Sequence, residues 1–205
     1  MATTLQETPS QTAGPYVHIG LIPRQAGFEI FQHEYGNVLT TAETKGERIR
    51  IEGRVLDGVG FPCKDVLLEI WQANAEGKYD HPADRQSKRH DPAFHGWGRA
   101  GTDFATGLYG FETVKPGIVE GRHSRPMAPH VSFWLVSRGI NIGLQTRMYF
   151  SDEEAANDSD PVLNIIEQPQ RRQTLIARRQ IRDGMVVYVF DIHLQGEQET
   201  VFFDV

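Results

Sequence analysis

Charged and apolar residues alternate one for one along residues 48–55, which read RIRIEGRV. Successive side chains of a β-strand point to opposite faces, so this pattern places the isoleucines on a buried face and the charges in solvent. Residues 66–71 (VLLEIW) are almost continuously apolar and predict a central strand covered on both faces. Further strands are predicted at residues 108–114, 131–137, 144–150, 186–194 and 200–203. With the glycine-containing turns between them, these segments predict a mainly β protein, an antiparallel β-sandwich.

Helix is predicted only as a short excursion at residues 151–179, where Pro161 and Pro169 would divide the helical pieces. Two arginine pairs, 171–172 and 178–179, fall in this segment. We interpret them as a solvated or subunit-facing helix surface, with an anion site as the alternative. The chain length of 205 residues suits one domain with one core. We therefore predict a single domain over residues 1–205, with an extended N-terminal arm formed by about the first 20 residues.

The charge balance argues against nucleic acid as a partner. The chain has 21 basic and 27 acidic side chains, a net charge of -6, and its basic residues are dispersed. Cys63 is the only cysteine, which rules out an internal disulfide, and no apolar run approaches the ~20 residues that span a bilayer. The first residues lack the basic and apolar segments of a secretion signal. A cytoplasmic protein without a membrane partner is therefore predicted.

Two polar stretches, residues 8–15 and 79–96, are candidate functional segments, because a long irregular loop in a compact domain is usually functional or disordered. The second stretch could in principle supply a metal site of two histidines and one carboxylate. Its candidate ligands are His81, His90, His95, Asp80, Asp84 and Asp91. No helical or strand spacing holds them on a common face, so we interpret the cluster as the composition of a polar loop.

His130 stands at the start of a predicted strand, where a His-x-His pair would aim two imidazoles at one ion. Ser132 occupies the second position, and a serine hydroxyl is a poor replacement ligand. From the residues alone, His130 is a hydrogen-bonded histidine at a strand start, and Tyr79 is a packing residue with a solvated hydroxyl. The sequence contains no nucleophile elbow and no glycine-rich phosphate loop.

Several independent motifs resemble those of the intradiol ring-cleavage dioxygenases, in particular the alpha chains of the two-subunit members. They are residues 8–16 (TPSQTAGPY), 69–74 (EIWQAN), 127–130 (MAPH), 137–142 (SRGINI) and 195–204 (QGEQETVFFD). The resemblance implies a β-sandwich that works with an iron-binding beta subunit in a large hetero-oligomer. It also implies cleavage of protocatechuate between its hydroxyls by O2 and a non-haem Fe(III), giving 3-carboxy-cis,cis-muconate.

The iron-binding chains of this family use two tyrosines and two histidines. Carried over by position, the first tyrosine matches Tyr79 and the first histidine matches His130, whereas the second tyrosine falls at Val119 and the second histidine at Ser132. Fe(III) is a hard ion that favours anionic oxygen, and two ligands do not hold it tightly. The resemblance therefore implies four vestigial ligand positions, no metal and no catalytic residue in this chain alone, with Fe(III) in the partner subunit.

Two further differences from the iron-binding chains lie beside these positions. An arginine ahead of the histidine pair corresponds to Met127, and a glutamine corresponds to Arg147. A guanidinium at Arg147 would repel a trivalent cation, so we interpret it as a substitute for the charge of the missing metal. The alternative is a surface arginine on a strand.

In the enzymes that this chain resembles, the arm lines the substrate pocket of the iron-bearing partner. The resemblance assigns this role to Thr12, Gly14, Pro15 and Tyr16, with Arg138 placed to favour the carboxylate of the substrate. The alternative is that the arm only clamps the subunits together.

Two other functions compete with that of an iron-free subunit. One is a stand-alone β-sandwich binding module without catalysis, which the extensive motif match disfavours. The other is a self-sufficient metalloenzyme that recruits Asp80 or His81 as ligands, which Val119 and Ser132 disfavour.

Overall fold

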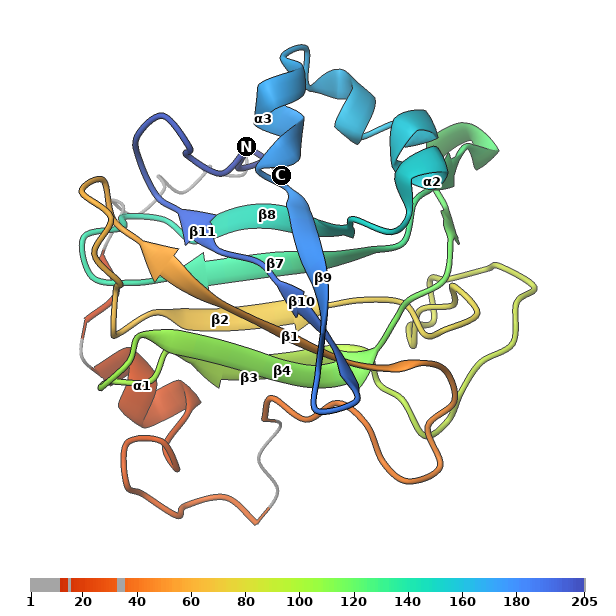
Figure 1. Cartoon of the computed structure of the whole chain (residues 1–205). Coiled ribbons are helices and arrows are strands. Elements are labelled where there is room, and N and C mark those ends of the chain that lie inside the picture. The colour runs from red at the N-terminus through yellow and green to blue at the C-terminus, as the bar shows by residue number, and fades with distance from the viewer. Residues whose placement is uncertain (1–11, 15, 33–35, 205) are drawn as a thin grey trace, which may run out of the picture.

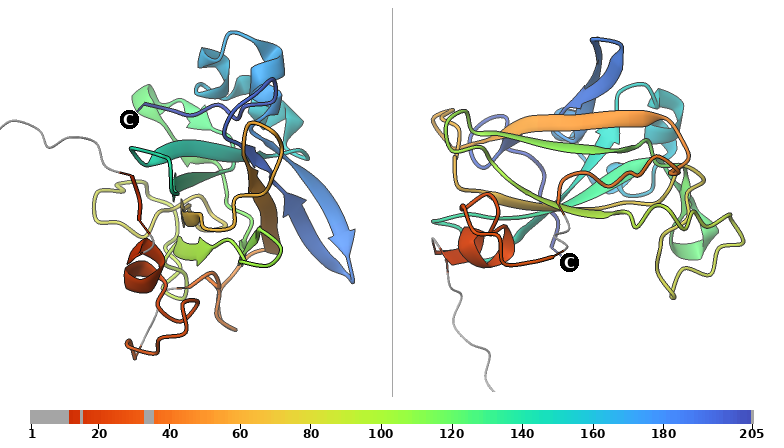
Figure 2. Two further views of the ribbon diagram at one scale, coloured as in Figure 1. Left: turned by 90° about the vertical axis from the view of Figure 1, so that its left-hand side faces the viewer. Right: turned by 90° about the horizontal axis from the view of Figure 1, so that it is seen from below.

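Two layers of strands face each other in the computed structural model, which describes residues 12–14, 16–32 and 36–204 (Figure 1, Figure 2). The first layer holds β4 (Leu108–Val114), β1 (Arg48–Leu56), β10 (Met185–Val189) and β9 (Ile176–Arg182). The second layer holds β8 (Leu144–Phe150), β7 (His130–Val136), β2 (Leu67–Trp71) and β3 (Trp97–Gly101). The start of β9 pairs with the end of β8 and links the layers, and β11 (Ile192–His193) pairs with the end of β1.

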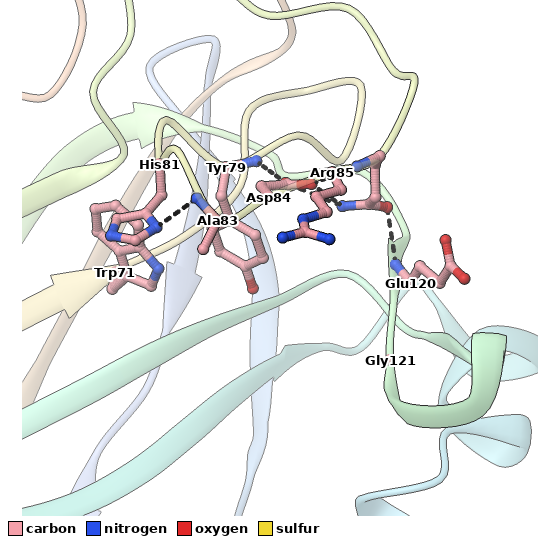
Figure 3. A pocket seen from close by; sticks show the side chains of 9 residues that line it. Trp71, Tyr79, His81, Ala83, Asp84, Arg85, Glu120 and Gly121 are labelled. Carbon is pink, nitrogen blue, oxygen red and sulfur yellow. Dashed lines mark hydrogen bonds between the residues drawn. The ribbon is translucent and has the colours of Figure 1, made fainter.

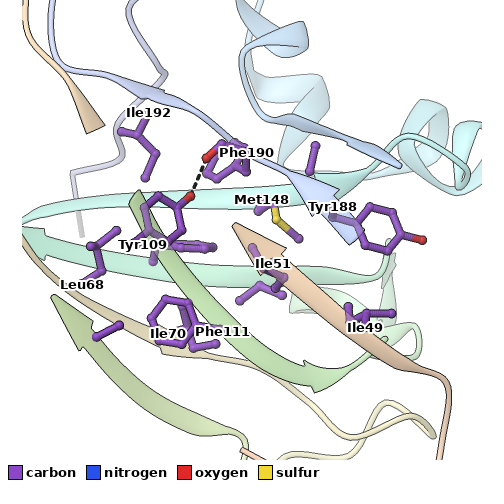
Figure 4. Packing of buried hydrophobic residues seen from close by; sticks show 14 of the residues in the cluster. Ile49, Ile51, Leu68, Ile70, Tyr109, Phe111, Met148, Tyr188, Phe190 and Ile192 are labelled. Carbon is purple, nitrogen blue, oxygen red and sulfur yellow. Dashed lines mark hydrogen bonds between the residues drawn. The ribbon is translucent and has the colours of Figure 1, made fainter. Parts of the chain in front are cut away.

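The prediction of a mainly β protein is confirmed, and the structure adds that the sheet is mixed. Strand β1 runs parallel to β10 and to β11, and β8 runs parallel to β9, while the other described pairs of these strands are antiparallel. The alternating residues of β1 behave as the pattern predicts, with Ile49 and Ile51 buried. They pack with Phe111 of β4 against residues of the second layer such as Ile70 and Met148 (Figure 4).

The predicted helical segment is present, but its last helix ends at Gln173, before residue 179. It consists of α2 (Glu154–Ser159), the 3-10 turn η2 (Leu163–Ile165) and α3 (Pro169–Gln173). The prediction that Arg178 and Arg179 lie on a helix surface is wrong, because both belong to β9 and pair with Val189 and Tyr188 of β10. Burial of Ala177 and the backbone bonds to β10 outweigh the helical spacing of this segment. Residues 200–203, predicted as a strand, form only an isolated bridge between Phe203 and Gln145.

Helix α1 (Tyr16–Leu21) and strand β3 were not predicted from the sequence. The two lie against each other, and the glycines of β3 make the approach possible. A Cβ atom on Gly101 would lie 2.5 Å from Cδ1 of Ile22, just after α1, and one on Gly98 would lie 2.5 Å from Cδ1 of Leu39. The same glycines lower the strand propensity of residues 97–101, which explains why the sequence pattern did not reveal β3.

A small hairpin stands beside the loop of residues 79–96. It is formed by β5 (Val119–Glu120) and β6 (Pro126–Met127), with η1 (Arg122–Ser124) between them. The loop itself contains no helix or strand, as expected from its polar sequence. Across the described ranges, none of the helices has the length and apolar character needed to span a bilayer.

Candidate functional site

Tyr79 and His130, which lie far apart in the sequence, meet in the structure. Tyr79 follows a turn held by Asn74, and its backbone N–H donates a 2.8 Å hydrogen bond to the carboxylate of Asp84. Its ring stacks on Trp71 with centroids 5.8 Å apart and an interplanar angle of 5°. The Tyr79 hydroxyl lies 3.4 Å from Nε2 of His130, the first residue of β7. Two of the four predicted ligand positions are therefore in direct contact.

The contacts of His130 define its protonation state. Nδ1 lies 2.7 Å from the carbonyl oxygen of Ala128, and because a carbonyl only accepts, Nδ1 carries the hydrogen. Nε2 is then the acceptor for the Tyr79 hydroxyl. The side chain is 3% exposed, and burial, followed by the charge of Arg147, lowers the pKa of His130 to about 4. Burial also raises the pKa of Tyr79. Both groups are therefore neutral near pH 7.

The other two positions supply nothing that would complete an iron site. Val119 is buried and pairs with Met127 in the β5–β6 hairpin. Ser132 lies on β7, between Trp71 of β2 and Arg147 of β8 in the strand register. Across the described part of the chain, no group of three or more His, Cys, Asp or Glu residues is arranged to hold a metal ion. One tyrosine and one histidine do not supply the ligand set that holds Fe(III).

Arg147 places a positive charge beside the Tyr79–His130 pair. Its guanidinium lies 3.6 Å from the sulfur of Met127. Its charge adds to burial in lowering the pKa of His130 and partly offsets the rise that burial causes in the pKa of Tyr79. A buried carboxylate, Asp160, acts on the pKa of His130 in the opposite direction and accepts 2.8 Å hydrogen bonds from three backbone N–H groups. This placement favours the interpretation of Arg147 as a charge in place of a metal over that of a surface arginine.

A depression of about 730 Å³ opens next to Tyr79 (Figure 3). Its lining comes from the loop of residues 79–96, from Trp71 and from the β5–β6 hairpin. Within the loop, His90 and His95 each donate a 2.9 Å hydrogen bond to the carboxylate of Asp80. The bond from His95 is the main reason why the pKa of Asp80 is lowered. These hydrogen bonds connect three residues of the loop that are far apart along it.

The predicted partner-facing residues form a second group. Thr12 Oγ1 accepts a 2.8 Å hydrogen bond from the backbone N–H of Gly139, and Arg138 forms an ion pair with Asp65. Gly14 and Arg138 both line a pocket of about 400 Å³. Tyr16 begins α1 and is 80% exposed. Pro15 lies outside the described residues.

The two groups lie at opposite ends of the strands. Helix α1 stands at one end in Figure 1 and in the right-hand view of Figure 2, whereas the loop of residues 79–96 stands at the other. Within one chain they do not share a site. The residues that hold the arm, His18, Asp65 and Arg99, were missed by sequence reasoning. The sequence carries no signal for them, because each is recognisable only by its distant partners.

Comparisons with known proteins show the family to which this chain belongs. The dioxygenase family model matches residues 29–196. The alpha chain of protocatechuate 3,4-dioxygenase from Pseudomonas putida is 51% identical over 98% of this chain and 97% of its own length. The chain belongs to the intradiol dioxygenase family. The beta chain of protocatechuate 3,4-dioxygenase from Burkholderia cepacia is also similar, with 38% identity over 80% of this chain and 71% of its own length.

A solved structure shows the same fold. Hydroxyquinol 1,2-dioxygenase from Pseudomonas putida DLL-E4 has a TM-score of 0.59 and 19% identity, covering 86% of this chain and 72% of that protein. Intradiol dioxygenases are iron enzymes, and this chain is related to both an alpha and a beta chain. The resemblance seen in the sequence motifs is confirmed.

Proposed function

We propose that this chain is the iron-free alpha subunit of an intradiol dioxygenase that cleaves protocatechuate with O2 to 3-carboxy-cis,cis-muconate. In this function it completes the active site of an iron-bearing beta subunit within a large hetero-oligomer. The observation that supports the proposal most strongly is the state of the four ligand positions. Tyr79 and His130 form a neutral hydrogen-bonded pair, and Val119 and Ser132 occupy the other two positions.

Electrostatics support the assignment of Fe(III) to the partner. A trivalent ion beside the Tyr79–His130 pair would lie near the guanidinium of Arg147, without a second phenolate or a second imidazole to offset its charge. The iron and the chemistry that it supplies, activation of a bound catecholate toward O2, therefore belong to the beta subunit. This chain contributes binding and orientation of the substrate.

The surface at α1 is the part of the chain suited to that contribution. Tyr16 is almost fully exposed, and Arg138 offers a guanidinium that matches the carboxylate of protocatechuate. Thr12 and Gly14 complete the partner-facing group, together with Pro15. The chain then acts as one domain over residues 1–205, with its arm against the partner. A cytoplasmic location fits the single cysteine, since disulfides are rare in reducing compartments.

The decisive experiment compares the chain alone with the chain co-purified with its beta subunit. Iron content, tyrosinate-to-iron absorption and protocatechuate-dependent O2 uptake are measured for both. We expect the isolated chain to be free of iron and inactive, and the complex to be coloured and active. Stoichiometric iron and turnover in the isolated chain would refute the proposal.

A Tyr79→Phe substitution tests the vestigial position directly. We expect the iron content and colour of the complex to stay unchanged, because Tyr79 donates to His130 and binds no metal. The bond is long at 3.4 Å, but its loss leaves the buried Nε2 of His130 without this donor, so it should cost about 1–3 kcal/mol of unfolding free energy. Iron analysis and visible absorption of the complex provide the measurement. Bleaching of the colour would mean that Tyr79 is a ligand.

A Gly14→Val substitution tests the arm. A Cβ atom on Gly14 meets no atom within 4 Å in this chain, so the thermal stability of the isolated chain should not change. In the complex we expect a higher KM for protocatechuate, because the added side chain would occupy space that the partner and the substrate share. The isolated chain is the control for folding. An unchanged KM would place Gly14 away from the substrate.

A further inference from the structure

Hydrogen bonds connect helix α1 to distant parts of its own chain on its N-terminal and its C-terminal side. On its N-terminal side, Thr12 Oγ1 accepts a 2.8 Å hydrogen bond from the backbone N–H of Gly139, in the β7–β8 connection. At its C-terminal end, the carbonyl oxygen of Leu21 accepts a 3.1 Å hydrogen bond from a guanidinium nitrogen of Arg99 on β3. The position of the helix is therefore determined without a partner subunit.

One side of this segment packs against the rest of the domain, whereas the other side is exposed to solvent. His18 and the following Ile22 are buried, and the His18 ring lies 5.7 Å from that of Phe104. Just beyond the helix, the side-chain amide of Gln25 donates a 2.8 Å hydrogen bond to the carbonyl of Thr102. Tyr16 remains exposed. The segment presents Tyr16 while its opposite side is packed.

Arg99 connects α1 to the central strands. Its Nε and one terminal nitrogen lie 2.8 and 2.5 Å from a carboxylate oxygen of Glu69 on β2, while the other terminal nitrogen bonds to Leu21. The guanidinium also lies over the ring of Trp97, 5.0 Å from its centroid. The guanidinium holds the carboxylate and the carbonyl through different nitrogens fixed in one plane, a geometry that the single ammonium nitrogen of lysine does not reproduce.

We infer that Arg99 is a positioning residue for ring cleavage, which keeps the arm formed before the partner and the substrate arrive. The inference rests on the proposed function. A segment that is ordered in advance avoids the entropic cost that a segment folding on its partner must meet. Arg99 touches neither substrate nor iron. It acts through the carbonyl of Leu21 on the placement of Tyr16 and Gly14.

The test uses Arg99→Lys in the assembled alpha–beta complex. Hydrogen–deuterium exchange of residues 16–22 is measured together with KM and kcat for protocatechuate. We expect faster exchange in this segment and a KM about 3- to 10-fold higher, with kcat unchanged. Arg48→Lys is the matched control, because Arg48, like Arg99, donates to the backbone of a loop, in this case to the carbonyls of Thr41 and Thr44. It should alter neither the exchange of α1 nor KM.

A second variant tests the same contact independently, in case Arg99→Lys does not fold. Glu69→Gln keeps the side-chain volume but weakens the charged anchor that holds the Arg99 guanidinium in place for Leu21, so it should show the same pattern to a smaller extent. Unchanged exchange of residues 16–22 in both variants would overturn the role of Arg99 and leave the proposed function intact. Faster exchange with an unchanged KM would also overturn it, and would show in addition that the arm does not reach the partner's pocket.

Discussion

Replacing Arg138 with glutamine in the alpha–beta complex is expected to raise the KM for protocatechuate about 10- to 100-fold without loss of iron. The guanidinium is 70% exposed and is held by its ion pair with Asp65, so it is available to a carboxylate outside its own chain. A hydrogen bond between charged groups contributes about 1.5–3 kcal/mol, and about 1.4 kcal/mol corresponds to a factor of ten in affinity. Steady-state O2 uptake measures the change.

The matched control is Arg50→Gln, which removes an exposed ion pair with Glu52 on β1, away from the arm. Its KM should equal that of the unmodified complex. Binding of catechol, which lacks the carboxylate, should also be little affected by Arg138→Gln. An unchanged KM for protocatechuate in Arg138→Gln would remove this residue from the substrate pocket. An equal loss for catechol would mean that Arg138 shapes the pocket rather than recognising the carboxylate.

Lowering the pH from 6.5 to 4 is expected to reduce the unfolding free energy of the isolated chain by roughly 3 kcal/mol through His130 alone. Burial, and then the charge of Arg147, lower the pKa of His130 from 6.5 to about 4 in the folded chain. The unfolded chain regains the ordinary value and therefore binds more protons between these pH values. Stability is complete above pH 6.5 and is lost progressively as the pH falls toward 4. Urea unfolding at a series of pH values measures the slope.

His130→Gln isolates this contribution, because glutamine can bond to the Ala128 carbonyl and to the Tyr79 hydroxyl without titrating. Its stability should depend less steeply on pH than that of the unmodified chain over the same range. His193→Gln, which removes a histidine from β11, controls for the general loss of one imidazole. Identical slopes for His130→Gln and the unmodified chain would show that His130 does not stay neutral and buried.

Local patterns in the sequence were sufficient for most of the strands. Residues 48–55 alternate because one face of β1 packs in the core, and this period depends only on neighbours along the chain. The prediction of four ligand positions also came from the sequence alone, since the presence of Val119 and Ser132 is a matter of residue identity. The arrangement around them could not be predicted in this way, because Tyr79 and His130 are 51 positions apart.

Where the sequence prediction was incomplete, contacts with residues distant in the sequence outweighed the secondary-structure preference of the segment itself. Residues 176–179 have helical spacing, yet they form β9 because residues 176–177 pair with β8 and residues 178–179 pair with β10. Strand β3 contains two glycines that weaken a strand in isolation, and it forms because α1 and Leu39 pack into the space that the glycines leave. Neither partner of these segments is adjacent to them in the sequence.

The sequence was thus enough to establish the family and the β-rich architecture, and to find Val119 and Ser132 at two of the predicted ligand positions, because these depend on residue identity or on short-range periodicity. The folded chain was needed to separate the Tyr79–His130 pair from the α1 surface, and to show how that surface is held. Arg99 reaches Leu21 across 78 positions and Arg138 reaches Asp65 across 73. Contacts between residues so far apart in the sequence leave no local sequence pattern, because only folding brings the partners within hydrogen-bonding distance.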